Sequence, residues 1–354
     1  MKIVKSHISR ISAVDFSNLI FGEEFTDHMF VCDYENGKWI NPKIIPYGEL
    51  KMQPSSSVLH YGQSVFEGMK AYKDDKDQIL MFRPEENFIR LNKSAKRLSI
   101  PEFPKKYFFE ALEVLLNLDK DWIMPGKGNS LYIRPFVFSN QASVQAAPAN
   151  KYKFLIICTP VNAYYSEKIS VLIAEKFSRA ANGGVGYAKA AGNYAAQFYP
   201  TSIAQEKGYE QVIWTDANNH EYLEEAGTMN IFFKIGDTLF TAPNNDRILD
   251  GITRKSIIEL CQFLKIKIQV KPVTVKELLS AHKNKSLKEI FGSGTAVVIL
   301  SIKSFSHNNV HYDIPDLKDP LSDFLKKKIM DIQCNIGKDP FEWRYKLPIL
   351  TSVK

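Results

Sequence analysis

The 354-residue sequence has no apolar run of the roughly 20 residues that a membrane-spanning helix needs. Its first residues, Met1-Lys2-Ile3-Val4, lead into no uninterrupted apolar stretch of the kind that forms a signal peptide. Cysteine is scarce, and the four cysteines lie far apart with no paired spacing, at Cys32, Cys158, Cys261 and Cys334. This spacing argues against a disulfide framework and a zinc site. We therefore predict a cytoplasmic protein that neither enters a membrane nor binds a metal.

Clustered charge is also absent, although the formal net charge is +7 and the sequence pI is about 8.9. The densest basic run, Lys326-Lys327-Lys328, lies between the apolar residues Phe324 and Ile329. This pattern indicates the solvated face of an amphipathic helix, so we predict no nucleic-acid partner. The scattered positive charge suits an anionic small ligand equally well.

Apolar periodicity predicts an α/β (α+β type) protein with two domains, as the chain length also favours. Strands are expected at 28–34, 78–82, 130–138, 151–159, 171–177, 211–215, 229–234 and 238–242. Helices are expected at 84–98, 107–118, 193–207, 253–264, 275–282 and 320–335. The pattern breaks near 160–166, and we predict an N-terminal domain at 1–161, a connection at 162–173 and a C-terminal domain at 174–354. A cleft between two such domains is a usual place for a cofactor.

Lys189 lies among small and aromatic residues, in the segment 183–194 (GGVGYAKAAGNY). Glycine and alanine on both sides would let a flat ligand approach the backbone closely. Loss of hydration would lower the pKa of the amine and yield the neutral nucleophile that a Schiff-base lysine needs. A solvated surface lysine is the alternative for this residue taken alone.

Two adjacent carboxylates occur in the segment 223–230 (LEEAGTMN). Successive side chains of an extended segment point to opposite sides, so we expect one of Glu224 and Glu225 to be solvated and the other to meet a partner. A carboxylate against a heteroaromatic nitrogen would keep that nitrogen protonated and make the ring an electron sink. The alternative is a solvated acidic turn.

Two segments could hold a phosphate. The segment 250–256 (DGITRKS) places a glycine before a helix N-terminus, where backbone N–H groups and the helix dipole favour an anion. The segment 290–296 (IFGSGTA) is a small-residue turn that could form an anion-binding nest. An ordinary helix cap and an ordinary glycine turn explain these segments equally well.

Further motifs occur in a fixed order along the chain: 59–70 (LHYGQSVFEGMK), 82–84 (FRP) with Arg90, and 131–135 (LYIRP). Together with the segments above, they resemble the branched-chain amino acid aminotransferases, which belong to the fold-type IV group of pyridoxal phosphate enzymes. The resemblance runs from about Val58 to about Trp343. It implies a two-domain fold with pyridoxal 5'-phosphate in the interdomain cleft and the Schiff-base lysine on the C-terminal domain.

The resemblance also implies roles for individual residues. Lys189 would be the catalytic residue, Glu225 would pair with the pyridine nitrogen, and Tyr194 would bond the phenolic oxygen. The remaining cofactor contacts would come from Arg90, Thr228, Ile252, Thr253 and Thr295. The substrate contacts would come from Tyr61, Phe66, Tyr132, Arg134, Tyr164, Thr295 and Ala296. Phe66 and Tyr132 could equally be core aromatics.

Arg134 follows Tyr132 by two residues on an alternating strand, so both side chains should face the same side. A guanidinium there could pair with the distal carboxylate of 2-oxoglutarate. A structural ion pair that never meets substrate is the alternative for Arg134.

The implied activity is a reversible transfer of the amino group between L-leucine, L-isoleucine or L-valine and 2-oxoglutarate, by a homodimer. D-amino acid aminotransferases and aminodeoxychorismate lyases share the lysine and the glutamate but differ in the pocket. Tyr61, Phe66 and the complete turn at 292–296 favour the branched-chain activity. An alternative of another class is a non-catalytic phosphate-ligand binding protein that uses the two anion-binding turns.

Overall fold

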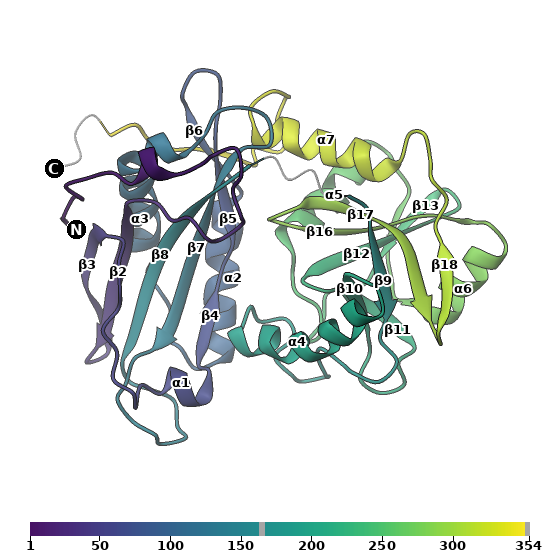
Figure 1. Ribbon diagram of the computed structural model, residues 1–354, viewed down its shortest axis with the longest axis horizontal. Helices are drawn as coiled ribbons and strands as arrows, with labels where there is room; N and C mark the ends of the chain where they lie inside the picture. The colour runs from purple at the N-terminus through teal and green to yellow at the C-terminus, as the bar shows by residue number, and fades with distance from the viewer. Residues whose placement is uncertain (163–166, 351–354) are drawn as a thin grey trace. The chain divides into compact units, whose positions relative to one another are not determined.

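A computed structural model describes residues 1–162 and 167–350, and the chain divides into two compact units (Figure 1). Unit 1 comprises Met1–Tyr164, Ala188–Ala191 and Met330–Lys354. Unit 2 comprises Tyr165–Tyr187 and Gly192–Ile329. No helix among the described residues is long and apolar enough to cross a membrane.

Unit 1 is built on one mainly antiparallel sheet. Its strands are β1 (Lys2–Ile3), β2 (His28–Glu35), β3 (Lys38–Pro46), β4 (Ser64–Phe66), β5 (Met69–Lys73), β6 (Ile79–Phe82), β7 (Ser130–Ser139), β8 (Tyr152–Val161) and β19 (Arg344–Lys346). Their order in the sheet is β1-β3-β2-β8-β7-β5-β6-β19, and β4 pairs with β7. Because β19 pairs with β6, the last described residues of the chain belong to unit 1.

The helices of unit 1 are α1 (Val58–Tyr61), α2 (Pro84–Arg97) and α3 (Lys105–Leu118), with short 3-10 turns at Ile11–Ala13 and Lys120–Trp122. Helix α3 packs against β2 and β3, and its Phe108 is fully buried. The aromatic core there includes Phe103 and Phe154, whose stacked rings have centroids 3.8 Å apart. Burial of such large rings stabilises this face of the sheet.

Unit 2 contains a sheet that closes on itself. Its strands are β9 (Ile169–Ile173), β10 (Gln211–Thr215), β11 (Tyr222–Ala226), β12 (Met229–Ile235), β13 (Thr238–Thr241), β14 (Ile268–Val270), β15 (Val273–Thr274), β16 (Leu287–Gly294), β17 (Val298–His307) and β18 (Val310–Asp313). Successive pairings join β9, β10, β11, β12, β16 and β17 into a ring, since β11 also pairs with β12 and β17 with β9. A closed ring leaves these strands without exposed edges.

The helices of unit 2 are α4 (Ala191–Glu206), α5 (Ile252–Phe263) and α6 (Val275–Lys283), and α7 (Leu321–Gln333) crosses from unit 2 into unit 1 along the chain. The core of unit 2 is mainly aliphatic and includes Val171, Ile213 and Ile231, together with the aromatic Phe305. Trp214 packs with Ala174 and Ala204 in a second cluster beside α4.

Most expected elements are confirmed within a few residues, but three expectations differ from the structure. The strand expected at 171–177 is β9 at Ile169–Ile173, so it lies earlier in the chain than expected. Gly292–Gly294, expected in a turn, ends strand β16 because these residues pair with β12 and β17. Lys189 and residues 330–354 fall in unit 1, whereas the sequence placed them in the C-terminal domain.

All four cysteines are buried free thiols. Burial raises the pKa of Cys32 and of Cys261 to about 12, and it also raises the pKa of Cys158 and Cys334. These thiols therefore behave as small hydrophobic residues.

Candidate active site

Main-chain hydrogen bonds join Lys189 to the strand that carries Phe66. The Phe66 N–H donates to the Lys189 carbonyl at 3.0 Å, and Ala190 forms an antiparallel bridge with Val65. On the other side, the Lys189 N–H donates to Ser94 Oγ at 2.9 Å. The backbone of Lys189 is thus held between β4 and α2 within unit 1.

The half-buried Lys189 side chain lies over the ring of Phe66, with Nζ 4.8 Å from the ring centroid. Its charge also acts on the carboxylate of Glu67, the residue after Phe66. An aromatic face and a carboxylate both attract a cation, so they hold the amine in a defined place. A nucleophilic amine needs such placement to react with a carbonyl group.

Arg134 and Tyr132 lie beside the same aromatic ring. The Arg134 guanidinium is 4.6 Å from the Phe66 ring centroid and 5.3 Å from that of Tyr132. Arg134 Nη2 donates to the Tyr132 hydroxyl at 3.1 Å, as strand alternation predicts. Arg134 Nε is buried and has no hydrogen-bond partner among the described residues. No carboxylate among these residues forms an ion pair with Arg134. This group could meet an anionic ligand.

Two further residues complete this part of unit 1. Gly68 faces Tyr132 so closely that a Cβ on Gly68 would lie 2.0 Å from the tyrosine hydroxyl. Phe21 packs edge-on against Tyr132, with ring centroids 5.0 Å apart. The sequence analysis missed both contacts, because neither residue stands in a periodic pattern.

Arg90 forms a buried ion pair with Glu67. Nε and Nη2 of Arg90 donate to the two carboxylate oxygens at 2.7 and 2.9 Å, and Asn87 adds a third donor at 2.7 Å. The Glu67 side chain is fully buried. The pair uses two of the five N–H donors that a guanidinium carries. The sequence analysis missed Glu67, whose one signal is a carboxylate inside the apolar run 65–69.

Glu225 is buried on β11 in unit 2 and accepts hydrogen bonds from three sides. Arg179 Nη2 lies 2.6 Å from Oε2, while Asn230 Nδ2 and the Leu249 N–H each donate to Oε1 at 2.9 Å. Asn230 is also the ladder partner of Glu225 on β12. This set of donors favours a charged carboxylate, as a ring-nitrogen partner requires.

Glu224 corrects one of our expectations. The sequence predicted that one of the two adjacent glutamates is solvated, but Glu224 is as deeply buried as Glu225. It points to the other side of the strand, where it pairs with Arg247 Nε. Burial raises the pKa of Glu224, and the charge of Arg247 partly offsets this effect. The sequence missed Arg179 and Arg247, which lie in loops.

The N-terminus of α5 lies next to the residues that hold Glu225. Asn230 Nδ2 also donates to the Leu249 carbonyl, and a Cβ on Gly251 would lie 1.8 Å from Asn230 Oδ1. Gly251 occupies the position before the helix and has no side chain to cap it. The N–H groups of Ile252 and Thr253 thus start a helix at an anion-favouring end.

The structure places the other predicted site residues as follows. Tyr194 is half-buried in the first turn of α4, and Thr295 and Ala296 are half-buried in the turn between β16 and β17. Thr228 is exposed in the turn between β11 and β12. Tyr61 is half-exposed on α1 and donates its hydroxyl hydrogen to the Val144 carbonyl. Tyr164 lies outside the described residues.

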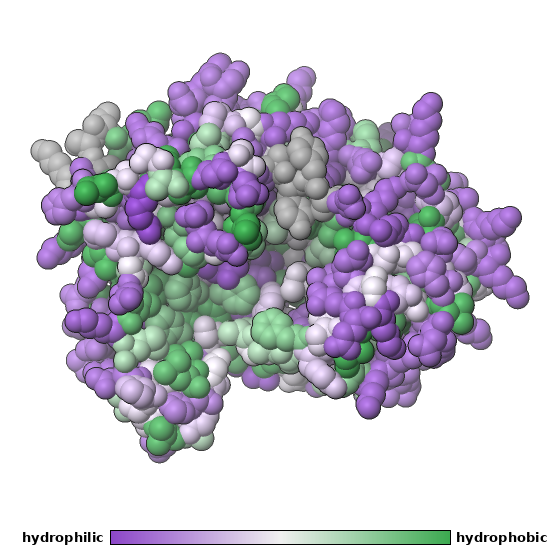
Figure 2. Space-filling view, viewed as in Figure 1, coloured by the Kyte–Doolittle hydropathy of each residue, from purple (hydrophilic) through white to green (hydrophobic). Residues whose placement is uncertain are grey.

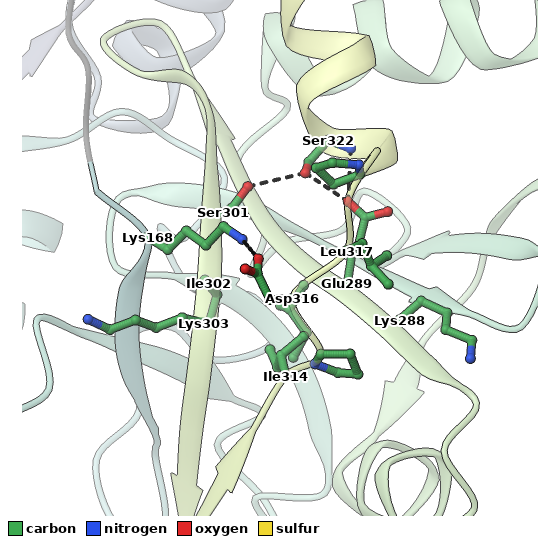
Figure 3. A pocket seen from close by; sticks show the side chains of 13 residues that line it. Lys168, Lys288, Glu289, Ser301, Ile302, Lys303, Ile314, Asp316, Leu317 and Ser322 are labelled. Carbon is green, nitrogen blue, oxygen red and sulfur yellow. Dashed lines mark hydrogen bonds and ion pairs between the residues drawn. The ribbon is translucent and has the colours of Figure 1, made fainter.

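A separate cavity of about 340 Å³ in unit 2 contains none of the predicted site residues (Figure 3). Glu289 lies in it and caps α7, accepting from the N–H groups of Leu321 and Ser322 at 2.8 and 2.9 Å. Asp316 pairs there with Lys168. With both carboxylates bonded, the cavity is the end of a capped helix rather than a reactive centre.

The described residues fit pyridoxal 5'-phosphate chemically. Unit 1 offers an amine held in place at Lys189, which can bond an aldehyde carbon. Unit 2 offers the Glu225 carboxylate for a protonated ring nitrogen and the start of α5 for a phosphate. Asn230 contacts Glu225 and the residues before α5, so these two features are joined within unit 2.

Comparison with known proteins shows the family to which this chain is similar. The family model "Amino-transferase class IV" matches residues 64–305. The branched-chain-amino-acid transaminase 1 of Bacillus subtilis (strain 168) is 43% identical over 338 residues, which cover 93% of this chain and 94% of that protein. The branched-chain-amino-acid aminotransferase of Mycolicibacterium smegmatis is 37% identical, with 92% of each chain covered.

Solved structures show the same fold. The Escherichia coli branched-chain amino acid aminotransferase matches with a TM-score of 0.74 and 26% identity, over 91% of this chain and 99% of that chain. The Thermobaculum terrenum branched-chain amino acid aminotransferase, solved in its PLP form, matches with a TM-score of 0.73 and 19% identity. The match covers 90% of this chain and 98% of that chain. The chain belongs to the class IV aminotransferases and, within them, to the branched-chain amino acid aminotransferase family. As a member of that family it has the fold-type IV architecture and is a transaminase.

Glu67→Gln should lower the free energy of unfolding by about 3 kcal/mol at pH 7, because it leaves the buried Arg90 without a counter-charge. Burial would raise the pKa of Glu67, but Arg90 holds it below its ordinary value of 4.5. A lowered folded-state pKa stabilises the fold above pH 4.5, and this contribution is lost as the pH falls through the folded value. Denaturant unfolding at a series of pH values should therefore show that the difference in the free energy of unfolding between the variant and the unmodified protein becomes smaller in acid.

Glu35→Gln is the matched control for this measurement. Glu35 pairs with Lys151 at 3.4 Å, but both side chains are exposed. Its loss should cost less than about 1 kcal/mol at pH 7. A Glu67→Gln variant as stable as this control, or a stability difference that persists unchanged in acid, would contradict the role of the buried pair.

Proposed function

We propose that this chain catalyses the reversible transfer of an amino group between L-leucine, L-isoleucine or L-valine and 2-oxoglutarate. The observation that carries the proposal is the Lys189 amine, held over Phe66 beside Tyr132 and Arg134. Curated relatives at 37–43% identity bear the branched-chain name, which favours this activity over the D-amino acid aminotransferase and lyase alternatives.

The proposed cofactor is pyridoxal 5'-phosphate. When bound, it supplies an aldehyde for covalent attachment and a ring that withdraws electrons from the substrate. Lys189 Nζ would form the covalent bond, and Glu225 would hold a proton at the ring nitrogen. The N–H groups of Ile252 and Thr253 would bind the phosphate. Further cofactor contacts are proposed for Arg90, Tyr194, Thr228 and Thr295.

The side chains of this protein would then perform the proton transfer. With the substrate bound, the Lys189 amine would act as the base that removes the proton from the substrate α-carbon. A positioned group of this kind contributes about 10²–10⁴-fold to the rate. The aliphatic substrate side chain would meet aromatic walls. The proposed substrate contacts are Tyr61, Phe66, Tyr132, Arg134, Tyr164, Thr295 and Ala296.

A homodimer in the cytoplasm is part of the proposal. Met29, Val31, Phe138 and Leu155 form a buried apolar cluster on the sheet of unit 1. Partly buried hydrophobic side chains, among them Phe136 and Ile157, pack against this cluster and reach the surface. Figure 2 shows a hydrophobic area over β2, β7 and β8 of unit 1. A contiguous apolar surface of this kind favours a second copy of the same chain as its cover. Free, buried thiols suit a reducing compartment.

A panel of single half-reactions tests the proposed function. Purified protein with bound cofactor should change its cofactor absorbance on mixing with L-leucine, L-isoleucine or L-valine, and recover it with 2-oxoglutarate. D-Alanine and D-glutamate serve as controls for the D-amino acid activity. A response to the D-amino acids in place of the branched-chain L-amino acids would refute the proposal.

Lys189→Ala should leave a folded protein that binds the cofactor only non-covalently and has negligible turnover. Borohydride reduction of the unmodified protein followed by peptide mass spectrometry should place the pyridoxyl group on Lys189. Lys70, a buried lysine on β5 in unit 1, serves as an internal control and should carry no adduct. A pyridoxyl group on any lysine other than Lys189 would overturn the assignment.

Arg134→Gln should impair the 2-oxoglutarate half-reaction much more than the leucine half-reaction. A buried carboxylate without a partner is costly, and loss of a charge-assisted hydrogen bond should amount to about 1.5–3 kcal/mol. Single-turnover measurements of each half-reaction give the two losses separately. Arg134→Lys, which keeps the charge but not the planar fork, should lose less. Equal losses in both half-reactions would assign Arg134 to the scaffold.

A further inference from the structure

Residues 11–26 form a loop of unit 1 whose two ends meet at the buried carboxylate of Asp27. The Arg10 N–H donates to Asp27 Oδ1 at 2.8 Å, and the Ser9 hydroxyl donates to Asp27 Oδ2 at 2.6 Å. Trp122 Nε1 donates to the same Oδ2 at 2.9 Å and ties the carboxylate to the 3-10 turn after α3. The side chain of Asp27 is only 8% exposed, and the proposed reaction makes no use of it.

Asp27 is held in its charged form. Burial would raise its pKa, but the hydrogen bonds from Arg10, Ser9 and Trp122 hold this pKa below its ordinary value. A charged acceptor forms stronger hydrogen bonds than a neutral one. An asparagine at position 27 would lack the charge and would turn an amide NH₂ toward one of the three donors, so it would hold the loop less tightly.

The Arg10 side chain joins the two ends of the loop a second time. Its Nη2 donates to the main-chain carbonyls of Phe25 and Thr26 at 3.1 and 2.6 Å, where the loop ends. The guanidinium also lies 5.1 Å from the ring centroid of Tyr47, and the Tyr47 ring stacks on that of Phe25. Asp27 and Arg10 thus hold the first and the last residues of the loop together.

Between its ends, the loop has few anchors among the described residues. None of residues 11–25 is as buried as a core residue. In the first half of the loop, the Phe16 carbonyl accepts from Asn162 Nδ2 at 2.7 Å. In the second half, Phe21 is 45% exposed and packs edge-on against Tyr132. A segment with so little buried surface opens readily, so its closed form depends on the contacts at its ends.

We propose that Asp27 is a positioning residue for substrate binding: it closes the loop 11–26 and so keeps Phe21 packed on Tyr132. The Tyr132 hydroxyl accepts from Arg134, so an open loop would remove the support of one wall of the proposed substrate pocket. If only a fraction of the molecules has a closed loop, the apparent substrate affinity falls by that fraction, while the chemical step is unchanged. The proposal rests on the proposed function, because it assumes that Tyr132 and Arg134 line the substrate pocket.

Two assays on purified protein with bound cofactor test the role of Asp27. The first is the single-turnover half-reaction with L-leucine, which gives a limiting rate constant and the leucine concentration at half-saturation. Asp27→Asn should raise this concentration about fivefold or more and leave the limiting rate constant within about twofold. The second assay is digestion by a glutamate-specific protease. Cleavage after Glu23 and Glu24 should be about fivefold faster or more in Asp27→Asn, because cleavage follows the population of the open loop.

Phe21→Ala shows whether Asp27 acts through the contact with Tyr132. Phe21→Ala alone should raise the half-saturating leucine concentration, and adding Asp27→Asn should then raise it by less than about twofold, because the positioned contact is already lost. An Asp27→Asn effect of equal size with and without Phe21 would overturn the inference. A Phe21→Ala variant that binds leucine as tightly as the unmodified protein would also overturn it. If Asp27→Asn does not fold, Arg10→Met replaces it, with the same results expected, because it removes the donors to the Phe25 and Thr26 carbonyls.

Asp74→Asn provides the matched control. Asp74 is 7% exposed and lies in the turn between β5 and β6 of unit 1, where it accepts from the N–H groups of Lys76 and Gln78 at 2.9 Å and from Asn335 Nδ2 at 2.8 Å. Burial would raise its pKa, but these hydrogen bonds hold it below its ordinary value, as at Asp27. This control should match the unmodified protein in both assays.

The outcomes separate the inference from the proposed function. An Asp27→Asn variant that behaves like Asp74→Asn in both assays would overturn the inference and leave the proposed function intact. An unmodified protein that does not respond to leucine would instead refute the proposed function, and the protease assay would still show whether Asp27 closes the loop.

Discussion

The hydrogen bond from the Phe66 N–H to the Lys189 carbonyl joins two segments that are far apart in the sequence. It sets the amine against the aromatic ring, and Arg134 approaches the same ring. The residue after Phe66 is Glu67, which holds Arg90. Strand β4 is only three residues long, so it depends on its pairing with β7 for stability. One short strand thereby positions the Lys189 amine, the Phe66 ring and the Glu67 carboxylate.

Buried charge is handled in the same way in both units. Glu67 has Arg90, Glu225 has Arg179 and Glu224 has Arg247. Each buried carboxylate would be costly alone, and its arginine offsets much of that desolvation. Groups fixed in this manner need little reorganisation when charge develops on a bound substrate. The electrostatic environment is therefore present before any ligand arrives.

Elements with a clear apolar period could be predicted from the sequence. Helix α2, for example, begins at Pro84 and buries Phe88, Leu91 and Ala95 at helical spacing. The end of β16 could not, because glycine is typical of turns and only the ladders to β12 and β17 show that Gly292 continues a strand. Local patterns describe a residue's own segment, whereas strand pairing depends on distant segments. The same limit applies to the candidate site. A sequence motif marks Lys189, and strand alternation places Arg134 beside Tyr132. The ion pair between Glu224 and Arg247 could not be predicted, because it joins a strand to a loop and the spacing of residues does not indicate it.

The contact between Gly68 and Tyr132 has a consequence for how relatives of this protein diverge. The tyrosine hydroxyl occupies the space in which any Cβ at position 68 would stand. Phenylalanine at position 132 would not be enough to admit alanine at position 68, because its ring carbon Cζ would still lie 2.8 Å from the new Cβ. The two positions should therefore covary among homologues, with a residue larger than glycine at 68 found only where the aromatic ring at 132 is missing or displaced.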